Sequence, residues 1–285
     1  MTGARVSVVM ITFNRAREAR RAVQRLRALD ESLPVLVVDN GSSDGTSTAL
    51  AREFPGITVI PLARNAGAAG RNVGVAAART PYVAFCDDDT SWEPGSLERA
   101  CGHLDRNPRL AVANARTVID PDGRDDPASL AMAQSPLPPH AASDGVPILG
   151  FMAGASVVRR DAFLGVGGFD PRFHIGGEEE LVAIDLARAG WDLSYCADTV
   201  VHHEPSRARN ATARERRRLR NAVWTAWLRR PMATVAARNL SLRQLPLRER
   251  WLVYREVVGG LPSMARDRHV VPADLEARLR LIEAA

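Results

Sequence analysis

The chain has 285 residues, of which 46% are hydrophobic and 25% are charged. That composition is typical of an ordinary globular protein and excludes a disordered, collagen-like or disulfide-built chain. The length suits one large α/β unit with an appendage as well as it suits two domains. Three cysteines without C-x-x-C spacing argue against a disulfide framework or a zinc knuckle, so we expect a cytoplasmic protein.

Charge is distributed unevenly along the chain. All 38 basic residues are arginine. Residues 1–204 hold 20 Arg against 26 acidic residues, and residues 205–285 hold 18 against 7, so the two parts carry net charges of −6 and +11. The basic tail predicts an anionic ligand or surface nearby. Every uncharged apolar run falls short of the ~20 residues that span a bilayer, so we expect no signal peptide or anchor, and only peripheral membrane contact.

The first 90 residues alternate short apolar runs with amphipathic stretches. Strands are expected at Val6–Ile11, Val35–Val38, Thr58–Pro61 and Tyr82–Phe85, and helices at Ala16–Leu29, Thr46–Phe54 and Gly67–Ala78. This alternation predicts βαβ units and a parallel sheet with helices on both faces. In such sheets ligands bind beyond the C-terminal strand ends.

The second half is less regular. Residues from about Asp120 to Val146 lack periodicity, and we expect a long loop of the kind that forms lids or acceptor-binding segments. The elements expected after it are a strand at Ile148–Val158, a short helix at Asp161–Gly165, a helix at Glu178–Ala189, a strand at Leu193–Val201, and helices at Arg214–Arg230, Pro231–Leu240 and Leu247–Gly259.

Three consecutive acids, Asp87, Asp88 and Asp89, follow the apolar run at 82–85. Their repulsion costs energy unless a cation compensates it, and Mg²⁺ and Mn²⁺ commonly bridge carboxylates to substrate phosphates. Alternate residues of an extended segment share a face, so Asp87 and Asp89 are expected to point together. The alternative is a solvated acidic turn that leads into a helix starting at 91–93.

Two polar segments follow other predicted strands. Asp39 is placed to accept a hydrogen bond from a base or a ribose hydroxyl, although plain turn chemistry accounts for the same segment through Gly41 and Gly45. Residues 65–72 open a helix whose glycines and free N–H groups admit a diphosphate, with Arg71 one turn in.

Four segments, in this order and spacing, resemble the family 2 glycosyltransferases with the GT-A fold. They are Met-Ile-Thr-Phe-Asn-Arg at 10–15, Val-Val-Asp-Asn-Gly-Ser-Ser-Asp-Gly-Thr at 37–46, Arg-Asn-Ala-Gly-Ala-Ala-Gly-Arg-Asn-Val-Gly at 64–74, and Phe-Cys-Asp-Asp-Asp at 85–89. The resemblance runs from residue 5 to about 230. It implies an α/β fold with a Rossmann-like, mostly parallel central sheet flanked by helices, and a C-terminal helical extension. A bacterial rhamnosyltransferase-like branch is one candidate.

The resemblance also implies a nucleoside-diphosphate sugar donor, with UDP, GDP or dTDP as the nucleotide, and Mg²⁺ or Mn²⁺ on the diphosphate. Asp87 and Asp89 would be the outer members of the family's Asp-x-Asp metal motif. The residues implied to lie near the base, ribose or phosphates are Thr12, Asn14, Arg15, Asp39, Asn65, Arg71 and Asp88.

Residues 177–191 resemble the Gly-Glu-Asp … Ala-Gly-Trp segment of the same family. Alignment on Gly190 and Trp191 places Glu179 where the family usually has Asp, the general base of an inverting enzyme. The Glu179 side chain is one methylene longer than the Asp of the family, and this departure leaves Glu178 as an alternative base. Three acids at a helix start also gain from the helix dipole without any catalysis.

Two further features bear on the site. In related enzymes a His after the strand at 193–201 can complete the coordination of the metal. Of His202 and His203 we favour His202 for this role. The alternative is that the two histidines merely end a strand at the surface. The basic helix predicted at Arg214–Arg230 contains Trp224 and Trp227, and three interpretations are open. It could be a lid over the donor phosphates, a segment that contacts anionic lipid, or a solvated Arg-rich face with the tryptophans in the core. No nucleic-acid motif accompanies the arginines, so we expect no nucleic-acid partner.

Together these features predict a metal-dependent, inverting glycosyltransferase of the hexosyltransferase type that acts on an acceptor hydroxyl. We expect a donor half at 1–119, an acceptor and catalytic half of the same GT-A domain at 120–210, and a basic helical extension at 211–285. The rivals are a sugar-phosphate nucleotidyltransferase and an inactive nucleotide-sugar-binding module. Neither the acceptor nor the oligomeric state is indicated by the sequence.

Overall fold

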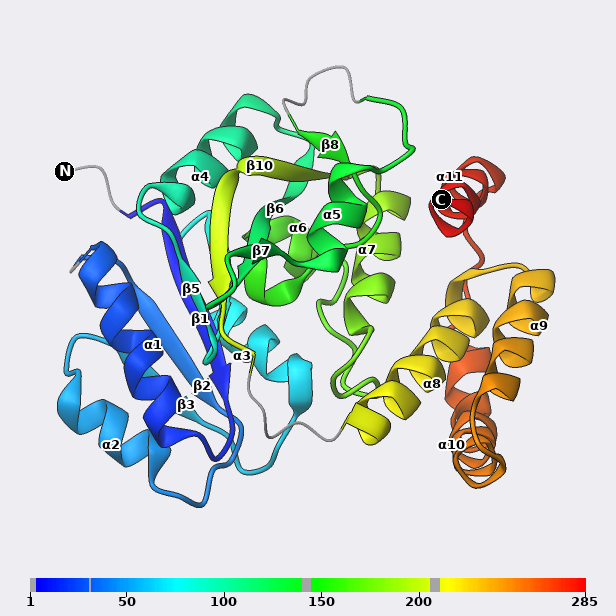
Figure 1. Cartoon of the computed structure of the whole chain (residues 1–285), viewed down its shortest axis with the longest axis horizontal. Coiled ribbons are helices and arrows are strands. Elements are labelled where there is room, and N and C mark those ends of the chain that lie inside the picture. The colour runs from blue at the N-terminus through cyan, green and yellow to red at the C-terminus, as the bar shows by residue number, and fades with distance from the viewer. Residues whose placement is uncertain (1–3, 31, 140–144, 206–210) are drawn as a thin grey trace.

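The computed structural model describes residues 4–30, 32–139, 145–205 and 211–285. Its centre is a ten-stranded sheet in the order β3-β2-β1-β4-β9-β6-β10-β5, with β7 beside β6 and β8 beside β10 (Figure 1). The strands are β1 (Val6–Thr12), β2 (Val35–Asp39), β3 (Thr58–Pro61), β4 (Tyr82–Asp87), β5 (Thr90–Trp92), β6 (Leu110–Ile119), β7 (Arg124–Asp125), β8 (Val146–Pro147), β9 (Ser156–Arg159) and β10 (Asp192–His203).

Helices cover both faces of the sheet. They are α1 (Ala16–Leu29), α2 (Thr46–Glu53), α3 (Gly70–Ala77), α4 (Ser96–Arg106), α5 (Pro127–Ala133), α6 (Arg160–Gly165), α7 (Glu178–Arg188), α8 (Ala211–Arg229), α9 (Met232–Ser241), α10 (Leu247–Arg266) and α11 (Ala273–Ala284), with 3₁₀ turns at Gly67–Ala69, Ala153–Ala155 and Leu242–Gln244. Every residue of β1 is buried. Val8 and Met10 pack with α1 and α4, while Val9 and Ile11 pack with α3 and α7. The predicted two-sided burial and the predicted strands and helices of residues 6–87 are confirmed.

The sheet is parallel from β3 to β4 and mixed beyond it. β9 runs antiparallel to both β4 and β6, and β10 runs parallel to β6 but antiparallel to β5. The strand predicted at Ile148–Val158 is wrong over most of its length, because pairing begins only at Ser156. Asn114 accounts for the late start of this strand. Its Oδ1 accepts hydrogen bonds from the Met152 N–H at 2.7 Å and the Ser156 hydroxyl at 3.0 Å, and the residues between these two donors form the 3₁₀ turn Ala153–Ala155.

The expectation of a long loop and the helix start in the alternative for the acid triplet are also wrong. The segment 120–146 is not one long loop, because it holds β7 and α5; Asp126 caps α5 by accepting from the Ala128 N–H at 2.8 Å, with Pro127 at the first helical position. Residues 140–144 of that segment lie outside the described residues. No helix starts at 91–93 either, because 90–92 pair with β10 as β5, and α4 begins at Ser96 after Gly95 in the left-handed region.

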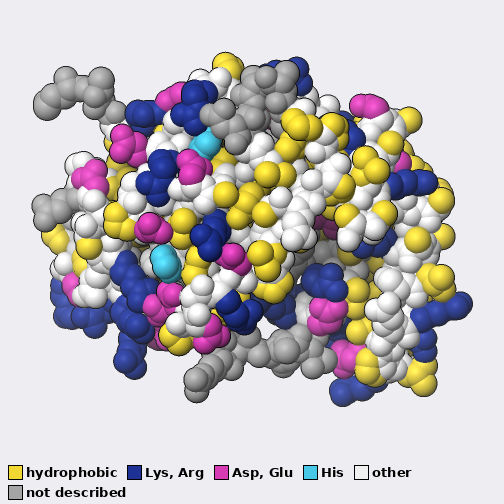
Figure 2. All heavy atoms as spheres, turned by 45° about the horizontal axis from the view of Figure 1, so that its top comes forward, with side chains coloured by type: hydrophobic (Ala, Val, Ile, Leu, Met, Phe, Trp, Pro, Cys, Tyr) yellow, Lys and Arg dark blue, Asp and Glu magenta, His cyan; other side chains and the backbone are white. Residues whose placement is uncertain are grey.

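The C-terminal helices form their own apolar cluster beside α7 (Figure 1). Leu219, Val223 and Trp224 of α8 pack against Val253 and Val257 of α10. The three helices predicted in the tail are confirmed, with α10 seven residues longer than expected. Figure 2 shows basic and acidic side chains interspersed over the face it draws. In the described part of the chain no helix combines the length and apolarity needed to cross a bilayer.

Candidate active site

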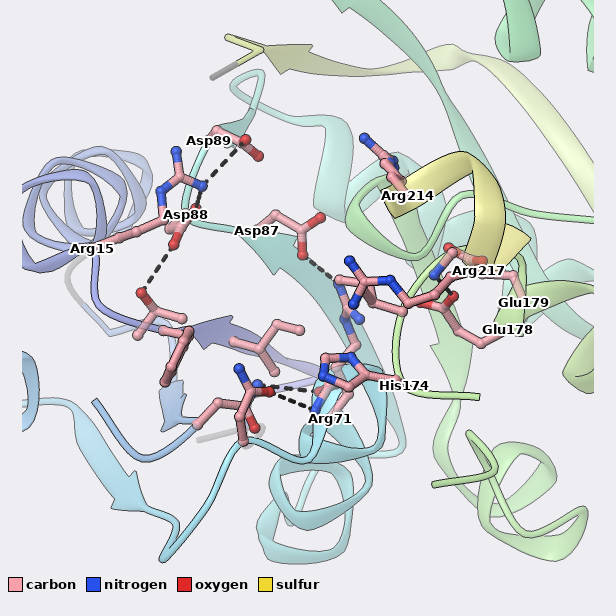
Figure 3. A pocket seen from close by; sticks show the side chains of 18 of the residues that line it. Arg15, Arg71, Asp87, Asp88, Asp89, His174, Glu178, Glu179, Arg214 and Arg217 are labelled. Atoms are coloured by element: carbon pink, nitrogen blue, oxygen red, sulfur yellow. Dashed lines mark hydrogen bonds and ion pairs between the residues drawn. The ribbon is translucent and has the colours of Figure 1, made fainter. Parts of the chain in front are cut away.

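A cleft of about 460 Å³ opens beyond the C-terminal ends of β1 and β4 (Figure 3). Of the residues predicted to form the site, the cleft is lined by Thr12, Arg15, Asn65, Arg71, Asp87, Asp88, Asp89, Glu178 and Glu179. Asn14, Asp39, His202 and His203 do not line it. The prediction missed Asn40, His174, Arg214 and Arg217, which do. Residues from six separate stretches of the chain therefore meet at this edge of the sheet.

The acid triplet is compensated by arginines. Asp88 accepts a hydrogen bond from the Thr12 hydroxyl at 2.9 Å and pairs with Arg15, which also lies 3.5 Å from Asp89. Burial raises the pKa of Asp88 to about 7. Asp87 pairs instead with Arg71. The expected shared face of Asp87 and Asp89 assumed an extended segment, but β4 ends at Asp87 and the next two residues form a turn.

The two histidines at the end of β10 face different neighbours. His203 Nε2 lies 3.9 Å from Asp89 Oδ1, whereas His202 Nδ1 lies 3.2 Å from Asp120 Oδ2. The strand alternation that separates them places His203, rather than the favoured His202, beside the acid triplet. Among the described residues no ready-made group of three His, Cys, Asp or Glu side chains could hold a metal.

Asn14 and Asp39 shape the loops behind the cleft. Asn14 has a left-handed backbone (φ 51°), and its side-chain oxygen accepts from the Ser43 N–H at 2.8 Å. Asp39 is buried, accepts from the Ser42 N–H at 2.9 Å, and accepts also from the Ser47 hydroxyl. The Asn14 side chain therefore joins the β1–α1 loop to the β2–α2 loop, and the Asp39 side chain holds the β2–α2 loop in place. Contact of either side chain with a base stays a prediction.

The glycine segment at 65–72 is held against the loop that precedes α7. Ala68 N–H donates to the His174 carbonyl at 2.6 Å, and a Cβ on Gly67 would clash with that same carbonyl. Asn65 accepts from the Gly67 N–H at 2.8 Å, and Asn40 donates to the Gly67 carbonyl at 3.1 Å. Only glycine fits position 67, because φ is +61° and the approach is too close for a side chain.

Arg71 is a buried cation at the floor of the cleft. Its side chain is 2% exposed, and its Cζ lies 5.6 Å from the ring centre of Phe169. Burial acts to lower the pKa of Arg71, but Asp87, Glu178 and Glu179 outweigh it and raise the pKa. Nε and Nη1 have no hydrogen-bond partner among the described residues. A buried guanidinium with two unused donors is suited to an anionic ligand.

Both candidate bases line the cleft at the start of α7. Glu178 is 3% exposed, and its carboxylate accepts from the Gly176 N–H. Burial, and then the neighbouring Glu179, raise the pKa of Glu178 to about 8. Burial also raises the pKa of Glu179. Both residues belong to the first turn of α7, and this end of the helix faces the cleft. Glu180 points elsewhere and lies 3.6 Å from Arg238.

The basic helix α8 closes one side of the cleft. Figure 3 shows Arg214 and Arg217 of α8 beside the cleft, between Asp87 and the two glutamates. No ion pair engages either arginine within the described residues. By contrast, Arg216, Arg218 and Arg220 pair with Glu249, Glu215 and Glu256 at 3.3, 2.7 and 3.0 Å. Trp224 is buried in the C-terminal cluster, as the core interpretation predicts.

Glu178 is expected to make stability depend on pH, and Glu178→Gln should remove its share of that dependence. A folded-state pKa of about 8, above the ordinary 4.5, means that folding favours the protonated form. The contribution is present below about pH 4.5 and is lost as pH rises to about 8, at up to ~1.4 kcal/mol per pH unit. Urea unfolding at pH 5, 6, 7 and 8 should therefore give a flatter profile for the variant than for wild type. Parallel profiles would show that the pKa is not raised.

Comparison with known proteins supplies the family. The sequence model of the family described as Glycosyl transferase family 2 matches residues 7–166. The chain is 33% identical, over 213 residues, to the pre-mycofactocin glycosyltransferase of Mycobacterium tuberculosis; the match covers 70% of this chain and 42% of that protein, so the chain spans less than half of its length. It is 27% identical over 242 residues to the N-acetylglucosaminyl-diphospho-decaprenol L-rhamnosyltransferase of the same organism, a match that covers 69% of this chain and 75% of that protein.

Solved structures show the same fold at low identity. The mannosyltransferase PcManGT of Pyrobaculum calidifontis, solved with GDP-Man and Mn²⁺, has a TM-score of 0.62 and 20% identity, and the match covers 100% of this chain and 87% of that one. TarS 1-349 of S. aureus, solved with UDP-GlcNAc, has a TM-score of 0.63 and 17% identity, covering 99% and 88%. The predicted GT-A fold is confirmed. With its family match over more than half of its length, the chain belongs to glycosyl transferase family 2.

Proposed function

We propose that the protein is a metal-dependent, inverting glycosyltransferase that moves a sugar from a nucleoside diphosphate to an acceptor hydroxyl. The observation that carries the proposal is a single cleft with the acid triplet at one end, Glu178 and Glu179 at the other, and three arginines between them. The names of the relatives and the ligands of the structural neighbours, GDP-Man with Mn²⁺ and UDP-GlcNAc, support it. A cytoplasmic location stays a prediction.

The donor set suits a hard divalent cation. Asp87, Asp89 and His203 supply carboxylate oxygens and an imidazole, which are acceptable ligands for Mn²⁺. Mg²⁺ and Mn²⁺ typically share their coordination with substrate phosphates and water. When bound, such an ion would stabilise the negative charge of the departing diphosphate. Arg15 would hold Asp88 and Asp89 in place during this step, because it contacts both carboxylates.

Glu179 is the better of the two candidate bases. The Glu178 carboxylate is almost fully buried and already holds the loop at Gly176, whereas Glu179 is only half-buried. A base must reach the acceptor hydroxyl, and a raised pKa brings its proton affinity closer to the working pH. Glu179 would take the acceptor proton as the acceptor oxygen bonds to the anomeric carbon. As that bond forms, the bond from the anomeric carbon to the diphosphate oxygen breaks on the opposite face, so the configuration inverts and the diphosphate leaves with the bonding electron pair.

Arg214 and Arg217 are proposed to bind the donor phosphates together with Arg71. Replacing both by Ala should weaken nucleoside-diphosphate binding about tenfold or more, because hydrogen bonds to charged groups contribute ~1.5–3 kcal/mol each. Arg218→Ala is the matched control, since this residue lies on the same helix but pairs with Glu215. Calorimetric titration measures both variants. Equal affinity in the double variant and the control would place the phosphates elsewhere.

The proposed donor class is tested by thermal stabilisation. UDP-, GDP- and dTDP-sugars are screened with Mn²⁺, with Mg²⁺ and with EDTA. We expect one nucleotide to raise the melting temperature only with metal, because a ligand at about 100 times its Kd adds ~2.7 kcal/mol. If no nucleotide stabilises the folded chain under any condition, the proposal fails. A stabilising donor without any sugar transfer would instead favour the inactive binding module.

A further inference from the structure

The helix α10 has two apolar faces, and only one of them is covered. Val253, Val257 and Met264 belong to the buried C-terminal cluster. On the other side an outer stripe, formed by Leu247, Trp251, Tyr254 and Val258, faces solvent. Leu247, Trp251 and Val258 are 74%, 62% and 60% exposed. Their spacing of i, i+4, i+7 and i+11 places the four side chains on one helix face. A contiguous exposed patch of this kind marks an interaction surface.

Unpaired arginines run along one edge of the outer stripe. Arg248, Arg255 and Arg266 fall at similar angles around the helix, next to the stripe, and all three are exposed. Arg255 stacks on Trp251, with its Cζ 5.4 Å from the ring centre. In the described chain none of the three forms an ion pair. The two acids of α10, Glu249 and Glu256, are instead turned to α8, where they pair with Arg216 and Arg220.

We propose that the outer stripe docks on the anionic face of a lipid bilayer. The stripe combines an aliphatic row with Trp and Tyr, the side chains that favour the headgroup region, and its edge carries arginines whose stems can bury while their charges meet lipid phosphates. A second copy of the chain fits this surface less well. It would bring two arginine rows into one interface with no free acid on the stripe to neutralise them.

The docked orientation would couple the bilayer to the cleft. Ion pairs of 3.3 and 3.0 Å join α10 to α8 through Arg216 and Arg220, and α8 also carries the two arginines that line the cleft. The cleft would therefore be held at a fixed height and angle above the membrane. This inference goes beyond the proposed function and does not depend on it, because the stripe and the cleft share no residue.

Vesicle flotation of the full chain tests the proposal. We expect binding to vesicles of phosphatidylcholine mixed with phosphatidylglycerol, little binding to phosphatidylcholine alone, and release as salt rises. Leu247→Ser with Trp251→Ser, and separately Arg248→Glu with Arg255→Glu, should each weaken binding at least about tenfold. Matched controls are Leu281→Ser with Ile282→Ser, and Arg52→Glu with Arg79→Glu, all exposed residues away from the stripe. The controls should bind like wild type.

Three outcomes would overturn the proposal. Wild type could bind both vesicle types equally or not at all, or the stripe variants could bind as well as their controls. Alternatively, sedimentation could show that wild type is a dimer and the stripe variant a monomer, while wild type does not bind vesicles. That result would assign the stripe to contact with a second copy of the chain. Melting temperatures verify that each variant is folded. Stabilisation by a nucleoside diphosphate reports on the cleft separately, so a failure here is distinct from a failure of the proposed function.

Discussion

Glu179→Gln should reduce sugar transfer by about 10²–10⁴-fold and leave donor affinity nearly unchanged. Glutamine keeps the shape and volume of the side chain but cannot accept the acceptor proton, and the loss of a general base typically costs this much. In the proposed function, donor binding depends instead on the acid triplet and the arginines, which the substitution leaves in place. Turnover and donor affinity are measured separately, by product formation and by calorimetry.

The neighbouring acids provide the controls. Glu180→Gln changes the same residue type on the same helix, but Glu180 lies 3.6 Å from Arg238 and outside the cleft, so transfer should stay near the wild-type rate. Glu178→Gln should alter the pH dependence of stability more than turnover, because its carboxylate holds the Gly176 loop. If Glu178→Gln abolishes transfer and Glu179→Gln does not, the roles of the two residues are exchanged.

Asp89→Asn should lower metal-dependent transfer about 10²-fold or more and abolish the effect of Mn²⁺ on nucleoside-diphosphate binding. A metal ion supplies several kcal/mol of transition-state stabilisation, and the amide is a poorer ligand than the carboxylate. The substitution keeps the volume of the side chain. Binding is measured with Mn²⁺ and with EDTA, and wild type alone should distinguish the two conditions.

Matched variants locate the metal. Asp120→Asn removes an acid at the same edge of the sheet that contacts His202 and does not line the cleft, so it should have little effect. His203→Gln should weaken the Mn²⁺ effect while His202→Gln does not, because only His203 approaches Asp89. A folded Asp89→Asn variant with an undiminished Mn²⁺ effect would remove Asp89 from the metal site.

The first part of the fold, residues 6–87, is predictable because its local signals and its tertiary environment agree. β1 is buried on both faces and is apolar apart from Ser7 and Thr12, and the left-handed glycines at 41 and 45 fall in turns between strand and helix. The second half departs where tertiary contacts override local patterns. Residues 90–92 become a strand because β10 pairs with them. Helix α10 continues past Gly260, whose missing side chain makes room for the Trp224 ring.

The site was predictable where its residues end strands, and not where distant elements complete it. The acid triplet, Arg15 and Arg71 lie within the motifs that carry the family resemblance. His174 lies in a loop without such a motif, and its left-handed backbone (φ 62°) leaves no trace in the sequence. Arg214 and Arg217 are two of many arginines in the tail, and only the packing of α8 distinguishes them from paired neighbours such as Arg218.

The release of nucleoside diphosphate from nucleotide sugars tests the central claim most directly. Wild type is incubated with UDP-, GDP- and dTDP-sugars and Mn²⁺, and a doubly substituted Asp89→Asn, Glu179→Gln chain purified in the same way gives the background. We predict that at least one donor is consumed faster by wild type, and that EDTA removes the difference. Equal rates for wild type and the double variant with every donor, together with no donor-induced stabilisation of either, would contradict the assignment of this cleft to a glycosyltransferase.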